Sequence, residues 1–274
     1  MSAHNPTQQE PDPLAYLNPE SCAVITIDCL ATFMRASGAL SISAYQMNAL
    51  GAEQARVQSE IDAVGLRIAE VRQALFEAKI PQIQFQDAHV IESVHGKRFH
   101  SMELVREGEI PDFVRTFPPH ALLDHTRRFG TEDQQAIPEI KIAQSHEVLI
   151  RWFDDALPVE AELTPTHELI FMKDDFCMAP GNPHLDRLFW ELRRQRRTNL
   201  IIMGVCDEIC NLRNVLLMLS ALFNVFYVED ATYPLDPAKR APALDYMRRF
   251  NPLGQLRAGQ WERVRAEQLV RLFG

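Results

Sequence analysis

The chain has no excess of basic residues. Its 274 residues include 28 Lys and Arg against 37 Asp and Glu, which gives a formal net charge of −9. Nucleic acids and anionic membranes attract positively charged surfaces, so this balance argues against either partner. It favours solubility instead.

Long apolar runs are also absent. Residues 215–223 form the longest one, interrupted by Ser220, whereas a membrane-spanning helix needs about 20 apolar residues. Residues 1–13 are polar and contain prolines, unlike a signal peptide or a membrane anchor. The five cysteines are an odd number, which favours a reducing compartment over a disulfide framework. We therefore predict a cytoplasmic protein that binds neither membrane nor nucleic acid.

Short β-rich runs alternate with helical segments along the chain. A hydrophobic share of 46% indicates an ordered globular protein, and a long helix over residues 51–79 is predicted from apolar residues recurring every three or four positions. Strands are predicted at residues 22–27, 83–87, 148–150, 169–173, 200–203 and 225–228. This alternation predicts an α/β fold, a three-layer, doubly wound, mostly parallel sheet with helices on both faces.

The domain organisation predicted from the sequence is simple. We find no repeat, low-complexity tract or linker, and therefore expect one domain over residues 15–274 after a flexible tail at residues 1–14. The irregular region 95–138 is long for a connection inside a compact domain. It is predicted to be a functional loop or lid.

A thiol follows one of the predicted buried strands. Residues 204–210 read Gly-Val-Cys-Asp-Glu-Ile-Cys and precede an apolar helical segment, so Cys210 is expected on the first turn of a helix. The backbone N–H groups and the helix dipole there would favour thiolate over thiol. The same N–H groups could bind the oxyanion that forms when sulfur attacks a carbonyl. Taken alone, such a cysteine is more often a small packing residue.

Other chemically active side chains also follow predicted strands. Asp28 ends the first strand, Asp87 the second and Lys173 the fourth. Ligands of open parallel sheets bind beyond the carboxyl ends of the strands, so these residues can converge there with Cys210. A carboxylate can take the proton of a thiol and pass it to a leaving group. A lysine lowers the thiol pKa and stabilises negative charge, although Asp after a strand is also common in turns.

Together these residues resemble a known family. The chain resembles the isochorismatase-like cysteine hydrolases in the order and spacing of its motifs from about residue 23 to 250. The residues that carry the resemblance are Asp28, Lys173 and Cys210, together with Gly-Val at 204–205 and Glu-Asp-Ala at 229–231. The resemblance implies an Asp-Lys-Cys triad on a doubly wound sheet. It also implies a cis Val205–Cys206 peptide bond that shapes the oxyanion hole.

A second set of residues resembles the metal site of the nicotinamidase branch. Asp87-Ala88-His89 and the later Phe-Pro-Pro-His at 117–120 imply that Asp87, His89 and His120 bind a divalent metal that orients the substrate ring. Two imidazoles and a carboxylate suit zinc first, with iron or manganese as alternatives. Asp112 lies where some relatives carry another acidic ligand. Three further histidines of the region could be solvated or could replace one of the ligands, namely His95, His100 and His125.

The sequence thus predicts a metal-assisted cysteine hydrolase that converts a small carboxamide, such as nicotinamide, to an acid and ammonia through a thioester. In this reaction Asp28 would deprotonate Cys210, and Lys173 would balance the negative charge. The backbone N–H groups of Cys206 and Cys210 would bind the oxyanion, and Phe33 would line the substrate pocket. The resemblance also implies a homo-oligomer. Two alternatives stay open, a metal-independent hydrolase of another C–N bond or a vinyl ether, and a non-catalytic binding protein on the same scaffold.

Overall fold

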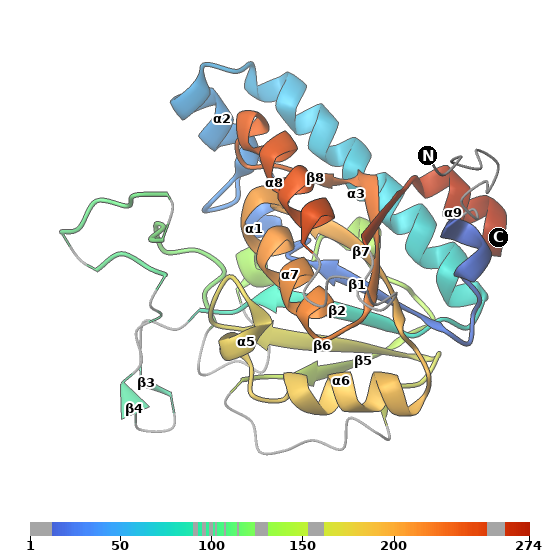
Figure 1. Ribbon diagram of the computed structural model, residues 1–274. Coiled ribbons are helices and arrows are strands. Elements are labelled where there is room, and N and C mark those ends of the chain that lie inside the picture. Colours follow the sequence, from blue (N-terminus) through green and yellow to red (C-terminus); the bar gives the residue numbers. More distant parts are fainter. Residues whose placement is uncertain are drawn as a thin grey trace, which may run out of the picture.

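The computed structural model describes residues 13–89, 93–94, 97–98, 101, 103–106, 108–113, 115–123, 131–152, 162–250 and 261–274. The chain forms a parallel sheet between two layers of helices (Figure 1). This confirms the predicted fold class. In the described part of the chain, no helix is both long enough and apolar enough to cross a membrane.

The central sheet has seven strands in the order β5-β6-β2-β1-β7-β8-β9, and every neighbouring pair is parallel. The strands are β1 (Cys22–Ile27), β2 (Gln82–Asp87), β5 (His146–Ile150), β6 (His167–Lys173), β7 (Asn199–Val205), β8 (Asn224–Tyr233) and β9 (Trp261–Val264). The six predicted strands correspond to all of these except β9. A separate antiparallel pair is formed by β3 (Ser93–Val94) and β4 (Lys97–Arg98).

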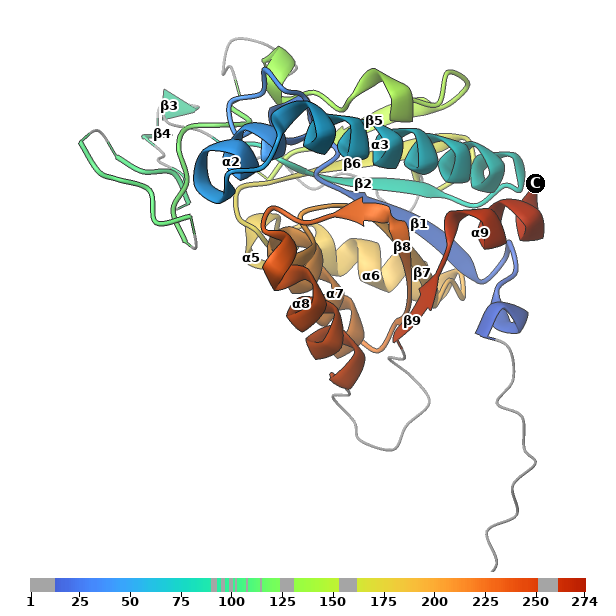
Figure 2. The same cartoon turned by 90° about the horizontal axis from the view of Figure 1, so that it is seen from above.

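Helices cover the two faces of the sheet, as Figure 2 shows. One face carries α2 (Ile42–Leu50), α3 (Gln54–Glu77) and α9 (Ala266–Phe273). The other carries α5 (Met178–Gly181), α6 (Leu185–Arg194), α7 (Leu212–Ser220) and α8 (Pro237–Arg249). The short helix α1 (Ala31–Met34) follows β1, and single 3₁₀ turns lie at Pro13–Tyr16, Glu132–Gln134 and Pro138–Ile140. Residues 1–12 of the predicted tail lie outside the described residues, and its last two residues begin the first 3₁₀ turn.

The long helix α3 packs through the predicted apolar stripe. All six stripe residues are buried, namely Val57, Ile61, Val64, Ile68, Val71 and Leu75. The helix begins three residues later than predicted because Gly51 ends α2 in the left-handed conformation, with φ 69°. Glycine adopts this conformation without the steric cost of a Cβ.

A buried polar network lies between α3 and the sheet. The guanidinium of Arg72, 1% exposed, donates to the carboxylate of Glu168 and to the carbonyl of Ile140. Gln84 of β2 also donates to Glu168. This network explains why the glutamines that alternate with apolar residues along β2 are buried rather than exposed.

The strand order of the sheet reverses at β1. The chain passes from β1 to β2 on one side, and later returns through β7 to the other side of β1. The carboxyl ends of β1 and β7 therefore border a crevice of the kind that binds ligands in doubly wound folds. At this point a Cβ on Gly204, φ 127°, would lie 2.0 Å from the carbonyl oxygen of Ile27, so only glycine fits. The Val205–Cys206 peptide bond that follows is cis, as the resemblance implied.

Candidate active site and metal centre

Three elements bring Asp28, Lys173 and Cys210 together. Asp28 follows β1, Lys173 ends β6, and Cys210 lies in a π-helical turn at Asp207–Asn211 that leads into α7. The Nζ atom of Lys173 lies 3.0 Å from Oδ2 of Asp28 and also donates to Asp87. One side-chain atom each of Asp28, Asp87 and Cys210 lies within 4.8 Å of the others. An acid, an ammonium and a thiol therefore share one buried crevice.

The backbone at Asp28 adopts a conformation that few non-glycine residues use. Its φ is 52°, in the left-handed region that aspartate tolerates better than most residues. The backbone N–H of Asp87 donates to Oδ1 of Asp28 at 2.8 Å. These contacts hold the carboxylate, leaving Oδ2 towards Lys173.

The acid and the ammonium shift each other's protonation. Burial raises the pKa of Asp28, against the opposing effects of Lys173 and Cys210. Burial disfavours the charged form of Lys173, but Asp28 and Cys210 outweigh it and raise the pKa of the ammonium. A carboxyl group with a raised pKa is a stronger base once ionised.

The environment of Cys210 differs from the one expected at a helix start. Burial raises the pKa of the Cys210 thiol well above its ordinary value, and the Asp28 carboxylate raises it further, while Lys173 lowers it. Desolvation of the side chain, which is 5% exposed, therefore opposes the thiolate that a helix start was expected to favour. A thiol in this environment needs a base, the role predicted for Asp28.

A second group of buried ligands adjoins this crevice. Asp87, His89 and His120, the three predicted metal ligands, lie together with Glu103, and one atom of each is within 4.8 Å of the others. The Nε2 atom of His89 is 2.8 Å from Oε1 of Glu103 and 3.8 Å from Oδ2 of Asp87. The Nε2 atom of His120 is 3.6 Å from Oε1 of Glu103 and 4.0 Å from Oδ2 of Asp87.

Each histidine of the group is oriented through its other ring nitrogen. Nδ1 of His89 lies 3.0 Å from Oδ1 of Asp174, which also accepts from the Ser101 hydroxyl. Nδ1 of His120 donates to the carbonyl of Pro118 at 2.7 Å. Both Nε2 atoms therefore face the group, as in protein metal sites where an outer hydrogen bond fixes the imidazole.

The residues present fit a divalent metal. Nε2 of His89 and Oε1 of Glu103 are buried and form an ion pair at 2.8 Å without the angle of a hydrogen bond, and Oε2 of Glu103 is buried without a hydrogen-bond partner. Buried polar atoms that make no hydrogen bond are costly unless something else binds them. Two ligands of a tetrahedral zinc ion lie about 3.3 Å apart, inside the range of separations in this group. Mixed nitrogen and carboxylate donors suit zinc, iron or manganese.

Without a cation the two histidines differ in their pKa. Burial alone would lower the pKa of His89, but the carboxylates of Glu103 and Asp174 outweigh this effect and raise the pKa to about 9. Burial and the neighbouring His89 lower the pKa of His120 to about 3. One carboxylate-bound imidazolium and one neutral imidazole thus share the group.

The additional acidic residue, which is the fourth member of the group, is not the one considered from the sequence. Asp112 is exposed, and its Oδ1 accepts from the backbone N–H groups of Arg115 and Thr116 at 2.7 and 2.9 Å. It caps a turn, while Glu103 joins the group. Glu103 lies in the irregular region with no motif around it, so no local signal marks it. The three histidines considered as replacement ligands, His95, His100 and His125, lie outside the described residues.

One cavity joins the thiol to the four candidate metal ligands, Asp87, His89, Glu103 and His120, which we call the metal group. Its volume is about 20 Å³, and Cys206 and Cys210 line it together with Asp87, Glu103 and His120. The remaining wall is apolar and consists of Phe33, Leu40, Phe117, Phe176, Ile209 and Leu235. The volume holds about one water molecule, so a larger ligand requires part of the wall to move.

Comparison with models of protein families finds no match, and comparison with curated proteins finds none either. Solved structures do match. The nicotinamidase/pyrazinamidase from Bacillus subtilis is 19% identical, with a TM-score of 0.56 over 88% of this chain and 99% of that one. The chain has the isochorismatase-like hydrolase fold.

Two further structures share this isochorismatase-like fold. A nicotinamidase/pyrazinamidase from Acinetobacter baumanii is 15% identical, with a TM-score of 0.56 over 92% of this chain and 99% of that one. N-carbamoylsarcosine amidase from Thermoplasma acidophilum is 15% identical, with a TM-score of 0.55 over 90% of this chain and 97% of that one. At these identities the comparisons establish the fold, and the assignment of chemistry depends on the geometry of the site.

Proposed function

We propose that this protein is a metal-assisted cysteine hydrolase that cleaves the C–N bond of a small carboxamide. The observation that carries the proposal is the shared cavity, which Cys210 lines together with three of the four members of the metal group. A substrate bound in the cavity would touch the nucleophile and the metal group at once. Nicotinamide is the first candidate, because structural relatives are named as nicotinamidases.

The protein's own residues supply the covalent chemistry. Asp28 takes the proton of Cys210, and the sulfur then attacks the amide carbon. The backbone N–H groups of Cys206 and Cys210 stabilise the oxyanion. Asp28 returns the proton to the leaving nitrogen, ammonia departs, and water hydrolyses the thioester to the acid and free thiol. Lys173 keeps the ionised Asp28 paired and balances negative charge through the cycle.

Asp87, His89, Glu103 and His120 would hold the cation, which when bound supplies a Lewis acid for a substrate heteroatom. Phe33, which packs edge-on against His120 at 5.4 Å between ring centroids, offers one apolar wall for a flat ring. Other walls come from the region predicted as a loop or lid, since Glu103 and Phe117 lie in it. Movement of this region would enlarge the cavity to admit the substrate.

A coupled ammonia assay over a panel of small carboxamides, with and without added zinc, iron and manganese, tests the proposal. We expect Cys210→Ala to abolish ammonia release while leaving the circular dichroism spectrum unchanged. Cys177→Ala is the matched control because Cys177 lies outside the cavity lining. Ammonia release by the Cys210→Ala protein would refute the covalent route.

Metal dependence is tested separately. We expect the purified protein to contain a divalent metal and to lose activity in a chelator, with recovery on adding metal. The buried atoms of His89 and Glu103 that make no hydrogen bond support this expectation over the metal-independent alternative. Full activity in metal-free protein would instead favour that alternative.

A further inference from the structure

The turn that carries Cys210 is held by a buried polar cluster outside the cavity. Its members, which we call the Asp207 cluster, come from three elements and none lines the cavity. They are Asp207 and Asn211 of the turn, Tyr227 of β8 and Arg240 of α8. No motif in the sequence analysis singled out this set, and the proposed reaction does not use it directly.

Two members join the ends of the turn to each other. Asn211, the residue after Cys210, donates through Nδ2 to the carbonyl of Gly204 and to the hydroxyl of Tyr227, each at 3.0 Å. Its Nδ2 also donates to Oδ1 of Asp207 at 3.3 Å, and the hydroxyl of Tyr227 donates to the same oxygen. The side chain of Asn211 therefore links the carbonyl of Gly204 to the carboxylate of Asp207 and the phenol of Tyr227.

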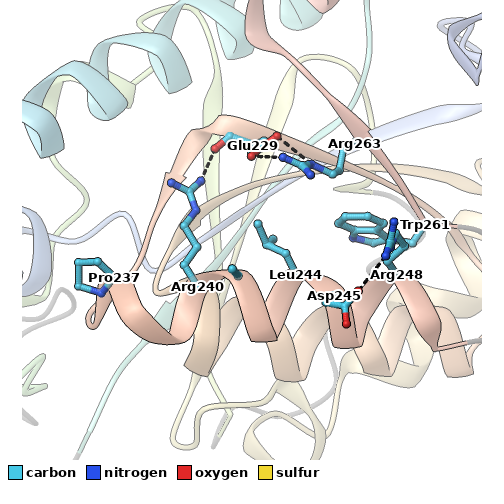
Figure 3. A pocket seen from close by; sticks show the side chains of 9 residues that line it. Glu229, Pro237, Arg240, Leu244, Asp245, Arg248, Trp261 and Arg263 are labelled. Carbon is cyan, nitrogen blue, oxygen red and sulfur yellow. Dashed lines mark hydrogen bonds and ion pairs between the residues drawn. The ribbon is translucent and has the colours of Figure 1, made fainter.

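Arg240 supplies the opposite charge from outside the turn. Its Nε lies 2.9 Å from Oδ2 of Asp207, an ion pair without the angle of a hydrogen bond. Its terminal nitrogen donates to the carbonyl of Glu229 and to the hydroxyl of Thr232. Figure 3 shows Arg240 reaching from α8 towards Glu229 at one side of a surface groove of about 400 Å³.

The charge of Asp207 makes this pairing necessary. Its side chain is fully buried, and burial raises the pKa of the carboxyl while Arg240 and Tyr227 lower it. A buried carboxylate without a partner is strongly destabilising. Loss of Arg240 would therefore make the turn move or make Asp207 take a proton, and either change alters the hydrogen bonds that hold the turn.

We propose that the Asp207 cluster consists of positioning residues that hold the thiol of Cys210 and the backbone N–H of Cys206 in their reactive geometry. The inference rests on the proposed function for the reaction that this geometry serves. The cluster acts through the backbone of the turn, since its side chains do not reach the cavity. Small displacements of reacting groups can reduce a rate about a hundredfold.

Arg240→Gln tests the proposal, with Arg248→Gln as its matched control. Both arginines lie on α8 and line the same groove, but Arg248 pairs only with Asp245 of its own helix in the contacts described and does not approach the turn. Two rates are measured in each protein. One is kcat and KM for the best amide of the panel, and the other is the rate at which iodoacetamide alkylates Cys210, followed by mass spectrometry with Cys177 as internal reference.

For Arg240→Gln we expect kcat to fall about ten- to a hundredfold, with KM changing less than about threefold. Alkylation of Cys210 should slow because a displaced thiol loses its base, while alkylation of Cys177 in the same protein stays near the rate in the parent protein. In Arg248→Gln, both the catalytic rate and the alkylation rate of Cys210 should stay near those of the parent protein. Arg240→Lys, which retains the charge but not the fork of donors, should recover part of kcat.

The proposal is overturned if Cys210 in Arg240→Gln is alkylated as fast as, or faster than, in Arg248→Gln. Should Arg240→Gln fail to fold, Tyr227→Phe removes one hydroxyl of the cluster at nearly constant volume, and the same comparison decides. If the parent protein hydrolyses no amide, the proposed function fails on its own. The alkylation rates then still test the positioning role, because they need neither substrate nor metal.

Discussion

Asp174 offers a direct test of the proposed metal centre, because it contacts the candidate ligand His89 without belonging to the ligand group itself. Its Oδ1 lies 3.0 Å from Nδ1 of His89 and also accepts from the Ser101 hydroxyl. This carboxylate orients the imidazole so that Nε2 faces the metal group, and its charge makes that nitrogen a better donor. Asp174→Ala removes both effects, whereas Asp174→Asn removes the charge and keeps an acceptor.

The expected loss in metal affinity follows from this geometry. Replacing an outer partner of a metal-bound histidine costs about ten- to a hundredfold in affinity, which is about 1.4 to 2.7 kcal/mol. The Asp174 side chain is 20% exposed, and solvent screens part of its charge. We therefore expect about tenfold for Asp174→Ala and a smaller loss for Asp174→Asn.

Competition with a chromogenic chelator measures zinc affinity in each protein. Asp112→Ala is the control, because this exposed aspartate lies in the irregular region that carries Glu103 but outside the group of candidate metal ligands. The reasoning is refuted if Asp174→Ala binds zinc as tightly as the parent protein. A loss confined to Asp112→Ala would show that the metal binds elsewhere.

Three other changes have expected outcomes. Gly204→Ala would place a Cβ 2.0 Å from a β1 carbonyl, and we expect urea denaturation to show a loss of more than about 1 kcal/mol. Glu168→Gln removes the charge that pairs with the buried guanidinium of Arg72 and should lower the free energy of unfolding by about 3–5 kcal/mol. The control Glu60→Gln removes one partner of an exposed ion pair and should lower it by less than about 1 kcal/mol, and equal losses in the two proteins would contradict this reasoning. Because burial raises the pKa of the Cys210 thiol, the reactive thiolate fraction, and with it the rate of alkylation, should rise about tenfold per pH unit from about pH 7 to 9. A rate that is constant below about pH 8 would show that the thiolate is already present there.

The elements most visible in the sequence are those whose pattern is local. The apolar residues of α3 and of β7 are each buried within one continuous segment of the chain. Their spacing along that segment therefore predicts a helix and a strand. The glutamines of β2 show where this rule ends. Their alternation with apolar residues does not reveal that both faces of the strand are buried, because Arg72 and Glu168 supply the partners from distant segments.

The sequence by itself determined six of the seven strands of the sheet and the chemical types at the strand ends, since Asp28, Asp87 and Lys173 follow runs that must form a buried sheet. Tertiary structure alone decided that Glu103 joins the candidate metal ligands, that Arg240 pairs with Asp207, and that burial raises the pKa of the Cys210 thiol. The reason is physical. Desolvation and ion pairing depend on which segments surround a group in space, and neighbours in the chain do not specify those segments.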